Sequence, residues 1–358
     1  MLTGGAGVKE IKLMYEQIRE YIEEETVGKA PGDALKSEVS YSAMFKVSRP
    51  TIRKAVDELV ASGIVKRLPG KGLTVGGQEE STEQSLKKLA ILVPFTAGDG
   101  FFYELVMGCV SILNVHGCSY SIYNYNEMDI RKQALELIRK NVYSGVIMTA
   151  YDYEDYEFIE ELKILRIPVV LVDNPMDVGD TPYVGSDDFS GGYMGTSYLI
   201  RHGHKKIVYI TLRNDIKTTQ LRLKGHLQAL SDNSITLTED YVIRLSKDDD
   251  IYDALSKLKV DYTAMSSYSD IPLIMACNYF MEKKIRIPSD VSLLGYGNCK
   301  ASELLQSPLT TISIPVNEIG IRAAKMMINY FEGKTDFSNT VLAVNLVERD
   351  SVNYYQFI

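Results

Sequence analysis

Apolar side chains near the beginning of the chain recur at the spacing of two helices. The first set lies within residues 8–22 and comprises Val8, Ile11, Met14, Tyr15, Ile18, Tyr21 and Ile22. The second set comprises Ile52, Val56, Leu59 and Val60 and leaves Arg49, Thr51, Arg53 and Lys54 toward the opposite face. Ser48 can cap this second helix, Pro50 suits its first turn and Gly63 can end it. The pattern therefore predicts an amphipathic helix whose basic face is free to meet phosphates.

A loop, a short helix and a hairpin are predicted around this basic helix. Pro31-Gly32-Asp33 indicates the loop, and the short helix is expected near Ser37 to Phe45. Residues 64–68 and 73–75 have the composition of strands and flank the glycine-rich tip Pro69-Gly70-Lys71-Gly72. Three helices followed by such a hairpin predict a winged helix-turn-helix, a fold that binds DNA.

Residues 8–76 resemble the GntR-type winged helix-turn-helix. The family's motifs appear in order as Tyr15 to Ile18, Pro31-Gly32-Asp33, Leu35-Lys36-Ser37-Glu38, Val47 to Arg53 and Gly70-Lys71-Gly72. Lys36 departs from the pattern, because the family usually has proline there. The resemblance implies DNA contacts from Ser37, Glu38, Ser48, Arg49, Thr51, Arg53, Gly70, Lys71 and Gly72. The alternative is that Arg49 and Arg53 only keep a helix face hydrated and contact no DNA, as is the case for most surface arginines.

Charge supports DNA binding only locally. The whole chain has a net charge of −8, so we expect its non-specific binding to DNA to be weak. Residues 46–71, in contrast, carry seven basic side chains and only two acidic ones. A basic segment on an acidic body favours selective docking over general coating of DNA.

The composition divides the chain into two domains and a linker. Residues 77–87 are polar and lack periodicity, which predicts a linker between a DNA-binding domain at residues 1–76 and a second domain at residues 88–358. The second region alternates short apolar runs with amphipathic segments. The runs lie at residues 89–93, 145–148, 169–173, 206–210, 262–265 and 291–294, and the helical segments at residues 102–115, 130–141, 156–165, 191–202, 219–230 and 270–283. This alternation predicts an α/β fold with two doubly wound lobes and a ligand cleft between them.

Residues 88–350 resemble the LacI-type effector domain, which shares the two-lobed fold of periplasmic binding proteins. The motifs are Pro168 to Asp173, Val184 to Asp188 with Gly191-Gly192-Tyr193, His202 to Ile207, Arg222 to Gly225, Ile287 to Tyr296 and Pro308 to Ile312. A GntR-type reader joined to a LacI-type effector domain is the arrangement of AraR-type carbohydrate-utilisation repressors, and the chain looks like one of them.

The resemblance also implies an effector pocket. It assigns to that pocket Phe101, Phe102, Asp187, Arg222, Ser269, Asp270 and Asn298. Arginine suits paired oxygen acceptors, and an aromatic ring suits the apolar face of a sugar. Packing at a helix start is an equal explanation for Phe101 and Phe102, and Asp270 can instead cap a helix. Gly297 replaces the aspartate that usually binds the sugar directly, so sugar identity does not transfer.

Other classes of protein are disfavoured by what the sequence lacks. The four histidines and four cysteines have no zinc-ligand or disulfide spacing, so no metal and no cofactor is expected. A phosphate-binding glycine loop is absent, which disfavours an enzyme such as a sugar kinase. A signal segment and an eighteen-residue apolar run are also absent, which predicts a cytoplasmic protein and disfavours a secreted binding protein.

The expected function is therefore a sequence-specific transcriptional regulator and not an enzyme. We expect a homodimer that binds double-stranded operator DNA and represses carbohydrate-utilisation genes. A small sugar between the lobes would release it, with an arabinose-like pentose as the first candidate. Response to another sugar or to a non-sugar ligand, activation instead of repression, and a constitutive architectural DNA binder remain alternatives.

Overall fold

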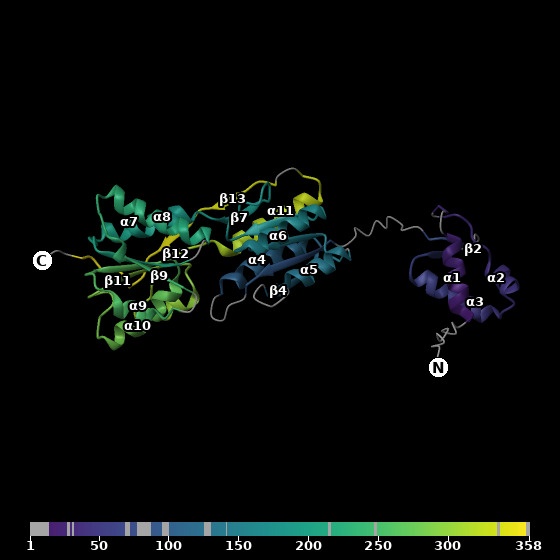
Figure 1. Ribbon diagram of the computed structural model, residues 1–358, viewed down its shortest axis with the longest axis horizontal. Helices are drawn as coiled ribbons and strands as arrows, with labels where there is room; N and C mark the ends of the chain where they lie inside the picture. The colour runs from purple at the N-terminus through teal and green to yellow at the C-terminus, as the bar shows by residue number, and fades with distance from the viewer. Residues whose placement is uncertain are drawn as a thin grey trace, which may run out of the picture. The chain divides into compact units, whose positions relative to one another are not determined.

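The chain folds as two compact units, Met1–Ser85 and Leu86–Ile358, which Figure 1 shows. The computed structural model describes residues 14–26, 29–30, 32–68, 72–76, 87–94, 100–124, 130–140, 142–213, 216–246, 249–334 and 337–355. The predicted linker, residues 77–87, lies outside these residues except for Lys87. Gly70 and Lys71 at the predicted wing tip also lie outside them.

The first unit is built from three helices and a two-stranded hairpin. They are α1 (Met14–Thr26), α2 (Glu38–Phe45), α3 (Arg49–Ala61), β1 (Val65–Leu68) and β2 (Gly72–Val75). The strands are antiparallel, and one further bridge joins Ala34 to Thr74. Apolar faces of all five elements share one core that includes Ile18, Tyr41, Ile52 and Leu73. The predicted winged helix-turn-helix elements are confirmed in order and in kind. Val8 and Ile11, which were predicted for the first helix, lie outside the described residues.

The predicted end of α3 is confirmed at Gly63, whereas the predicted cap at Ser48 is not observed. Gly63 follows α3 with φ of +76°, in the left-handed region that ends helices. Ser48 lies at the start of α3, but its side chain makes no capping bond to the helix backbone. Its hydroxyl lies 2.9 Å from that of Thr51, so the two hydroxyls pair with each other instead. Ser37, in contrast, caps α2 by accepting from the Ser40 N–H.

The second unit contains two lobes, each with a six-stranded sheet. The first sheet is parallel, in the order β13-β7-β6-β5-β3-β4. Its strands are β3 (Lys88–Val93), β4 (Ser119–Asn124), β5 (Gly145–Met148), β6 (Val169–Val172), β7 (Tyr183–Ser186) and β13 (Thr340–Leu342). The helices packed with it are α4 (Phe101–Val115), α5 (Ile130–Arg139), α6 (Tyr153–Ile164) and α11 (Val316–Phe331).

The second lobe repeats this plan with one antiparallel edge strand. Its order is β14-β12-β11-β10-β8-β9, and β14 (Asn345–Val347) runs against β12 (Thr310–Ser313). The remaining strands are β8 (Ile207–Leu212), β9 (Val242–Leu245), β10 (Ala264–Ser267) and β11 (Ser292–Tyr296). Its helices are α7 (Asp188–Arg201), α8 (Lys217–Asp232), α9 (Ile251–Lys257) and α10 (Asp270–Glu282), with 3-10 turns η1 (Glu239–Tyr241) and η2 (Lys300–Glu303).

Close packing of α7 on α8 fixes the position of α8 in this lobe. A Cβ atom on Gly192 would lie 2.0 Å from the carbonyl oxygen of Arg222, and one on Gly225 would lie 2.1 Å from that of Phe189. Only glycine allows this approach, because a larger residue on either helix would push the two apart. This close approach matters for the site, since Arg222 is carried by α8.

The predicted α/β fold with two lobes is confirmed, and each predicted strand and helix corresponds to an observed one. The sequence pattern did not reveal β4, β7, β9, β12, β13 and β14 or the helices α9 and α11. The chain passes between the lobes at β7–α7, at β12–α11 and at β13–β14. Both lobes are therefore built from segments that are distant in sequence.

Candidate effector cavity and DNA-binding surface

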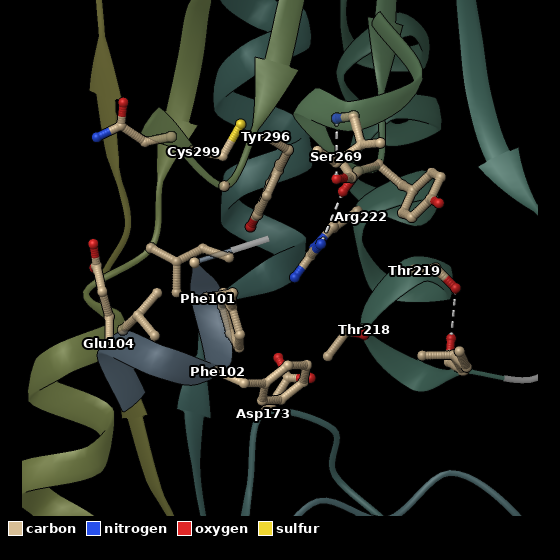
Figure 2. A pocket seen from close by; sticks show the side chains of 18 of the residues that line it. Phe101, Phe102, Glu104, Asp173, Thr218, Thr219, Arg222, Ser269, Tyr296 and Cys299 are labelled. Carbon is tan, nitrogen blue, oxygen red and sulfur yellow. Dashed lines mark hydrogen bonds between the residues drawn. The ribbon is translucent and has the colours of Figure 1, made fainter. Parts of the chain in front are cut away.

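A cavity of about 230 Å³ lies between the two lobes of the second unit (Figure 2). The first lobe contributes Phe101, Phe102, Glu104, Tyr151 and Asp173 to its lining, and the second contributes Thr218, Thr219, Arg222, Tyr268, Ser269 and Tyr296 among others. Asp173 directly follows β6, and Tyr268 directly follows β10. The cavity thus lies at the carboxyl ends of the strands, where open α/β sheets bind ligands.

Arg222 is held rigidly at the wall of this cavity. Its Nε donates to Oδ1 of Asp188 at 2.7 Å, and its Nη1 donates to the carbonyl oxygen of Tyr268 at 2.8 Å. The guanidinium also lies 4.1 Å from the centroid of the Tyr296 ring. Burial alone would lower the pKa of Arg222, but the adjacent Asp188 carboxylate outweighs it and raises the pKa. The guanidinium is therefore charged, and its Nη2 has no hydrogen bond to any residue that the structure describes.

Asp188 is the partner that orients this guanidinium. Its Oδ1 also accepts from the hydroxyls of Tyr296 at 3.2 Å and Ser186 at 3.3 Å. Its Oδ2 is buried and has no hydrogen-bond partner in the described part of the chain. Asp188 is the first residue of α7, where the helix dipole favours a negative charge. The sequence pattern did not single out this residue, although it follows directly on Asp187.

Asp187, the acidic residue expected in the pocket, lies elsewhere. It caps α7 by accepting from the Ser190 N–H at 3.0 Å, and it is not part of the cavity lining. Two consecutive carboxylates at the start of one helix thus have separate tasks. The Asp187 carboxylate accepts from the helix backbone, and the Asp188 carboxylate holds Arg222.

Asp270 is also not part of the lining, whereas its neighbour Ser269 is. Ser269 caps α10, and Asp270 lies behind it with an exposed fraction of 1%. Asp270 accepts from the Thr311 hydroxyl at 2.7 Å and from the Cys299 N–H at 2.8 Å. Burial raises the pKa of Asp270, while these bonds oppose that rise. Its carboxylate therefore anchors the turn that ends at Cys299.

That turn contains Gly297, the residue that replaces the aspartate of the resembling family. Gly297 and Asn298 both have positive φ, +113° and +55°, and both line the cavity. The Oδ1 atom of Asn298 accepts from Nη2 of Arg349 at 2.6 Å. The amide oxygen of Asn298 is thus engaged within the protein, and Gly297 offers no side chain.

The opposite wall of the cavity combines aromatic rings with one carboxylate. Phe101 and Phe102 begin α4 and pack edge to face, with ring centroids 5.0 Å apart. Oδ2 of Asp173 accepts from the Tyr151 hydroxyl at 3.0 Å. Figure 2 shows Phe102 and Asp173 on the side of the cavity that faces Arg222. Asp173 was not a predicted site residue, although it ends the strand motif that carried the family resemblance.

The first unit exposes part of the predicted DNA-reading face. Arg49 and Arg53 of α3 are exposed, and Thr51 is half-buried. Lys54 lies with its Nζ 3.7 Å from the centroid of the Tyr15 ring, so its charge is turned toward α1. The free basic face of α3 is consequently narrower than the sequence pattern predicted.

Glu38 of α2 connects α3 with β1 of the hairpin. It accepts from Nη2 of Arg67 at 2.7 Å, and its other oxygen lies 3.7 Å from Nε of Arg53. Arg67 also pairs with Asp57, so two carboxylates offset its charge. Ser37 caps α2, and Gly72 begins β2 with φ of +81°. Glu38 therefore ties α2, α3 and β1 together beside the predicted contacts.

Lys36, which replaces the family's proline, has a clear structural role. Its Nζ lies 2.8 Å from Oε2 of Glu25, which also accepts from the Tyr41 hydroxyl at 3.2 Å. Lys29 binds the other oxygen of Glu25 at 3.1 Å. The lysine thus fastens the loop before α2 to the end of α1, where a proline would only have stiffened it.

Comparison with known proteins agrees with this architecture. Residues 12–75 match the bacterial regulatory proteins of the gntR family, and residues 196–352 match the periplasmic binding protein-like domain. An arabinose metabolism transcriptional repressor of Halalkalibacterium halodurans is 28% identical over 84% of both chains. One from Geobacillus stearothermophilus is 24% identical over 85% of this chain and 87% of its own. The HTH-type transcriptional repressor PurR of Pasteurella multocida is 27% identical over 66% of this chain and 72% of its own.

Solved structures show the same fold. A complex of the regulator CelR with cellobiose superposes with a TM-score of 0.69 at 21% identity, covering 85% of this chain and 90% of that one. A LacI family regulator of Enterococcus faecium with bound ribose has a TM-score of 0.66 at 26% identity, covering 75% of this chain and all of that one. No described helix is long and apolar enough to cross a membrane, and no described cluster of side chains suits a metal ion.

The chain is therefore a transcriptional regulator in which a DNA-binding domain of the gntR family precedes a periplasmic binding protein-like domain. The relatives that it resembles include repressors of arabinose metabolism, and its second unit has the fold of a LacI family regulator. The relatives and family matches are regulators and not enzymes.

Proposed function

We propose that the chain represses genes for carbohydrate use and is released from its operator by a small hydroxylated molecule in the interlobe cavity. The observation that carries this proposal is Arg222, a buried arginine on the cavity lining whose charge is already balanced by Asp188. Its remaining N–H groups suit ligand oxygens, because a guanidinium presents its donors in a fixed fork. The proposed effector pocket comprises Arg222, Phe101, Phe102, Ser269 and Asn298, together with Asp173.

The size and chemistry of the cavity favour a monosaccharide. Its volume of about 230 Å³ lies below the range of roughly 300–1,000 Å³ that is usual for drug-sized ligands. Phe102 offers an apolar surface, and Asp173 and Arg222 offer an acceptor and donors on opposite sides. A pentose like arabinose is the first candidate, since two similar repressors act in arabinose metabolism.

The DNA-binding half of the proposal rests on the first unit. Arg49 and Arg53 of α3 and the wing around Gly72 would contact DNA, with Gly70 and Lys71 as the predicted wing tip. Ser37, Glu38, Ser48 and Thr51 lie at the starts of the two helices that would approach the phosphates, where free N–H groups favour anions. The protein would act on double-stranded DNA in the cytoplasm.

A homodimer would present two such readers to a two-fold operator. The second lobe has an apolar surface formed by the end of α10 and the residues that follow η2, which suits self-association. Met281 and Leu304 there have exposed fractions of 67% and 86%, and a hollow of about 640 Å³ lies between them and the neighbouring loops. Exposed apolar surface of this kind marks interaction sites in soluble proteins.

Ligand would control DNA binding because the cavity is lined by both lobes. A molecule that contacts Asp173 and Arg222 at once stabilises one arrangement of the lobes over others. A coupling of about 1–3 kcal/mol between the ligand and the operator is enough for a useful switch. The direction we propose is release of the operator.

The direct test begins with selection of operator sequences by the full-length protein from a random duplex library. Binding to the selected duplex is then measured by fluorescence anisotropy with pentoses, hexoses, deoxy-sugars and their phosphates. One sugar should weaken operator binding at concentrations near its dissociation constant. A response to none of these compounds would overturn the proposed sugar effector, and no selection of a duplex would overturn the proposed DNA binding.

A further inference from the structure

The charged residues that line the interlobe cavity are separated by sign. Both acidic residues of the described lining, Glu104 and Asp173, belong to the first lobe. Both basic residues, Arg222 and Lys300, belong to the second lobe. A bound molecule therefore meets one acidic wall and one basic wall.

The second lobe keeps its carboxylates away from the cavity. Asp188 and Asp270 are buried behind the lining, and each accepts hydrogen bonds from protein groups. Gly297 stands at the position where the resembling family carries an aspartate, so no side-chain carboxylate is supplied there. Among the described lining residues, the second lobe presents hydroxyl, amide, thiol and basic groups but no acid.

Lys300 adds a positive charge that no described acidic side chain balances within 4.0 Å. It is exposed at the first position of η2, and Glu303 of the same turn pairs with Arg349 at 3.0 Å. An exposed lysine is common on protein surfaces and alone indicates little. Here it shares a wall with Arg222, whose charge Asp188 balances but whose remaining N–H groups can still donate, so that wall offers an anion both donors and the charge of Lys300.

The acidic wall suits the rest of such a ligand. The Asp173 carboxylate can accept from sugar hydroxyls, and the ring of Phe102 can pack on the apolar face of a sugar. Thr218, Thr219 and Ser269 add hydroxyl groups on the second lobe. These groups would serve any sugar, whereas the charge of Lys300 on the other wall would be used only by an anionic one.

We propose that the effector is an anionic monosaccharide derivative, with its carboxylate or phosphate group toward Arg222 and Lys300 and its hydroxyls toward Asp173. This rests on the proposed function of the cavity as an effector site and narrows its ligand class. A sugar acid and a sugar phosphate share the required chemistry, which is several hydroxyls and one anionic oxygen group.

The test compares acids, phosphates and their neutral parents on the full-length protein by calorimetric titration. The compounds are L-arabinonate, D-galacturonate, D-ribose 5-phosphate and D-glucose 6-phosphate, with L-arabinose, D-galactose, D-ribose and D-glucose as neutral partners. One anionic compound should bind at least about tenfold more tightly than its neutral partner, because hydrogen bonds to an ionised acceptor are stronger. Whether a carboxylate or a phosphate compound gives this result identifies the group.

Two matched variants assign the preference to the basic wall. Lys300→Gln should weaken binding of the anionic compound by roughly two- to fivefold, as for other exposed ion pairs, and leave its neutral partner unchanged. Glu104→Gln removes a charge of opposite sign from the other wall and should strengthen binding of the anion. Added salt should weaken binding of the anion only.

Three results would overturn the inference. These are equal or tighter binding of a neutral sugar, an anion preference that Lys300→Gln leaves unchanged, and no binding by any anionic compound. In the first and third cases, a neutral sugar that still releases the operator would leave the proposed function standing. Failure of every compound to bind would instead count against the effector site itself.

Discussion

Arg222 and Asp188 form a buried ion pair in which the guanidinium Nε lies 2.7 Å from the carboxylate Oδ1. Their side chains have exposed fractions of 9% and 0%. The pair joins α8 to the start of α7 and also contacts Tyr296 of β11. The same contact that supports the second lobe therefore aims the arginine at the cavity.

Replacing Asp188 by alanine should destabilise the second unit strongly. Removing one member of a buried pair leaves the other charge buried without compensation, which costs about 3–5 kcal/mol. Denaturant unfolding followed by circular dichroism measures this loss. Asp187→Ala is the matched control at the adjacent residue, and it should cost only about 1 kcal/mol because it removes a helix cap. Equal losses in the two variants would contradict the separate roles of these carboxylates.

Operator binding should depend more on Arg49 than on Arg67. Arg49 is exposed on α3, whereas Arg67 is already paired with Glu38 and Asp57. Arg49→Ala should weaken binding of the selected operator by about 1–3 kcal/mol and lower its salt dependence. Arg67→Ala should have the smaller effect, measured by anisotropy at several salt concentrations. A larger effect of Arg67→Ala would show that its pairing changes on DNA.

Acid should destabilise the second unit through His226. Burial lowers the pKa of His226 from its ordinary value of 6.5 to about 3. Between these values the unfolded chain binds the proton more readily, so the free energy of unfolding falls as the pH drops below about 6.5. One such group contributes at most about 1.4 kcal/mol per pH unit.

His226→Gln isolates this contribution to the pH dependence. His226 lies 2.8 Å from the Thr196 hydroxyl through Nδ1 and stacks on Tyr209, so the variant keeps a polar side chain of similar reach. Urea unfolding between pH 5 and 7.5 should show a shallower loss of stability for the variant than for the original protein. Parallel curves would mean that another group causes the acid sensitivity.

Leu304→Lys should convert the proposed dimer into monomers. Leu304 follows η2 on the apolar surface beside the end of α10, and a lysine there would have to lose its hydration at the interface. Leu227→Lys is the control, because Leu227 on α8 is also exposed, at 47%, but belongs to another surface. Sedimentation velocity distinguishes the two species. A dimer that persists with Leu304→Lys would place the interface elsewhere.

Much of the fold could be predicted because its strongest local signals agree with its tertiary structure. The basic helix carried Pro50 at its start and Gly63 beyond its end, and both lie there in the structure. The strand at residues 89–93 was an uninterrupted apolar run, and it became a buried strand of a parallel sheet. In contrast, β4 has the mixed exposure of a sheet edge, so its sequence shows no long apolar run.

The candidate site was harder to predict because its details depend on contacts between distant residues. Nothing in the sequence distinguishes Asp187 from Asp188, since the direction of each side chain is set by the first turn of α7. Asp270 begins a helix, as expected, but its carboxylate anchors a turn that follows another strand. Phe101, Phe102, Arg222, Ser269 and Asn298 all line the cavity that the family resemblance implied.

Control of operator binding by a molecule that Arg222 holds can be measured directly. Anisotropy titrations with the selected operator would compare the original protein with Arg222→Lys, with and without the effector found in the screen. We expect the effector to weaken operator binding by the original protein by about 5–150-fold. The variant, which keeps the charge beside Asp188 but loses the fork of donors, should bind the operator and fail to respond. An unchanged response of Arg222→Lys would contradict the account.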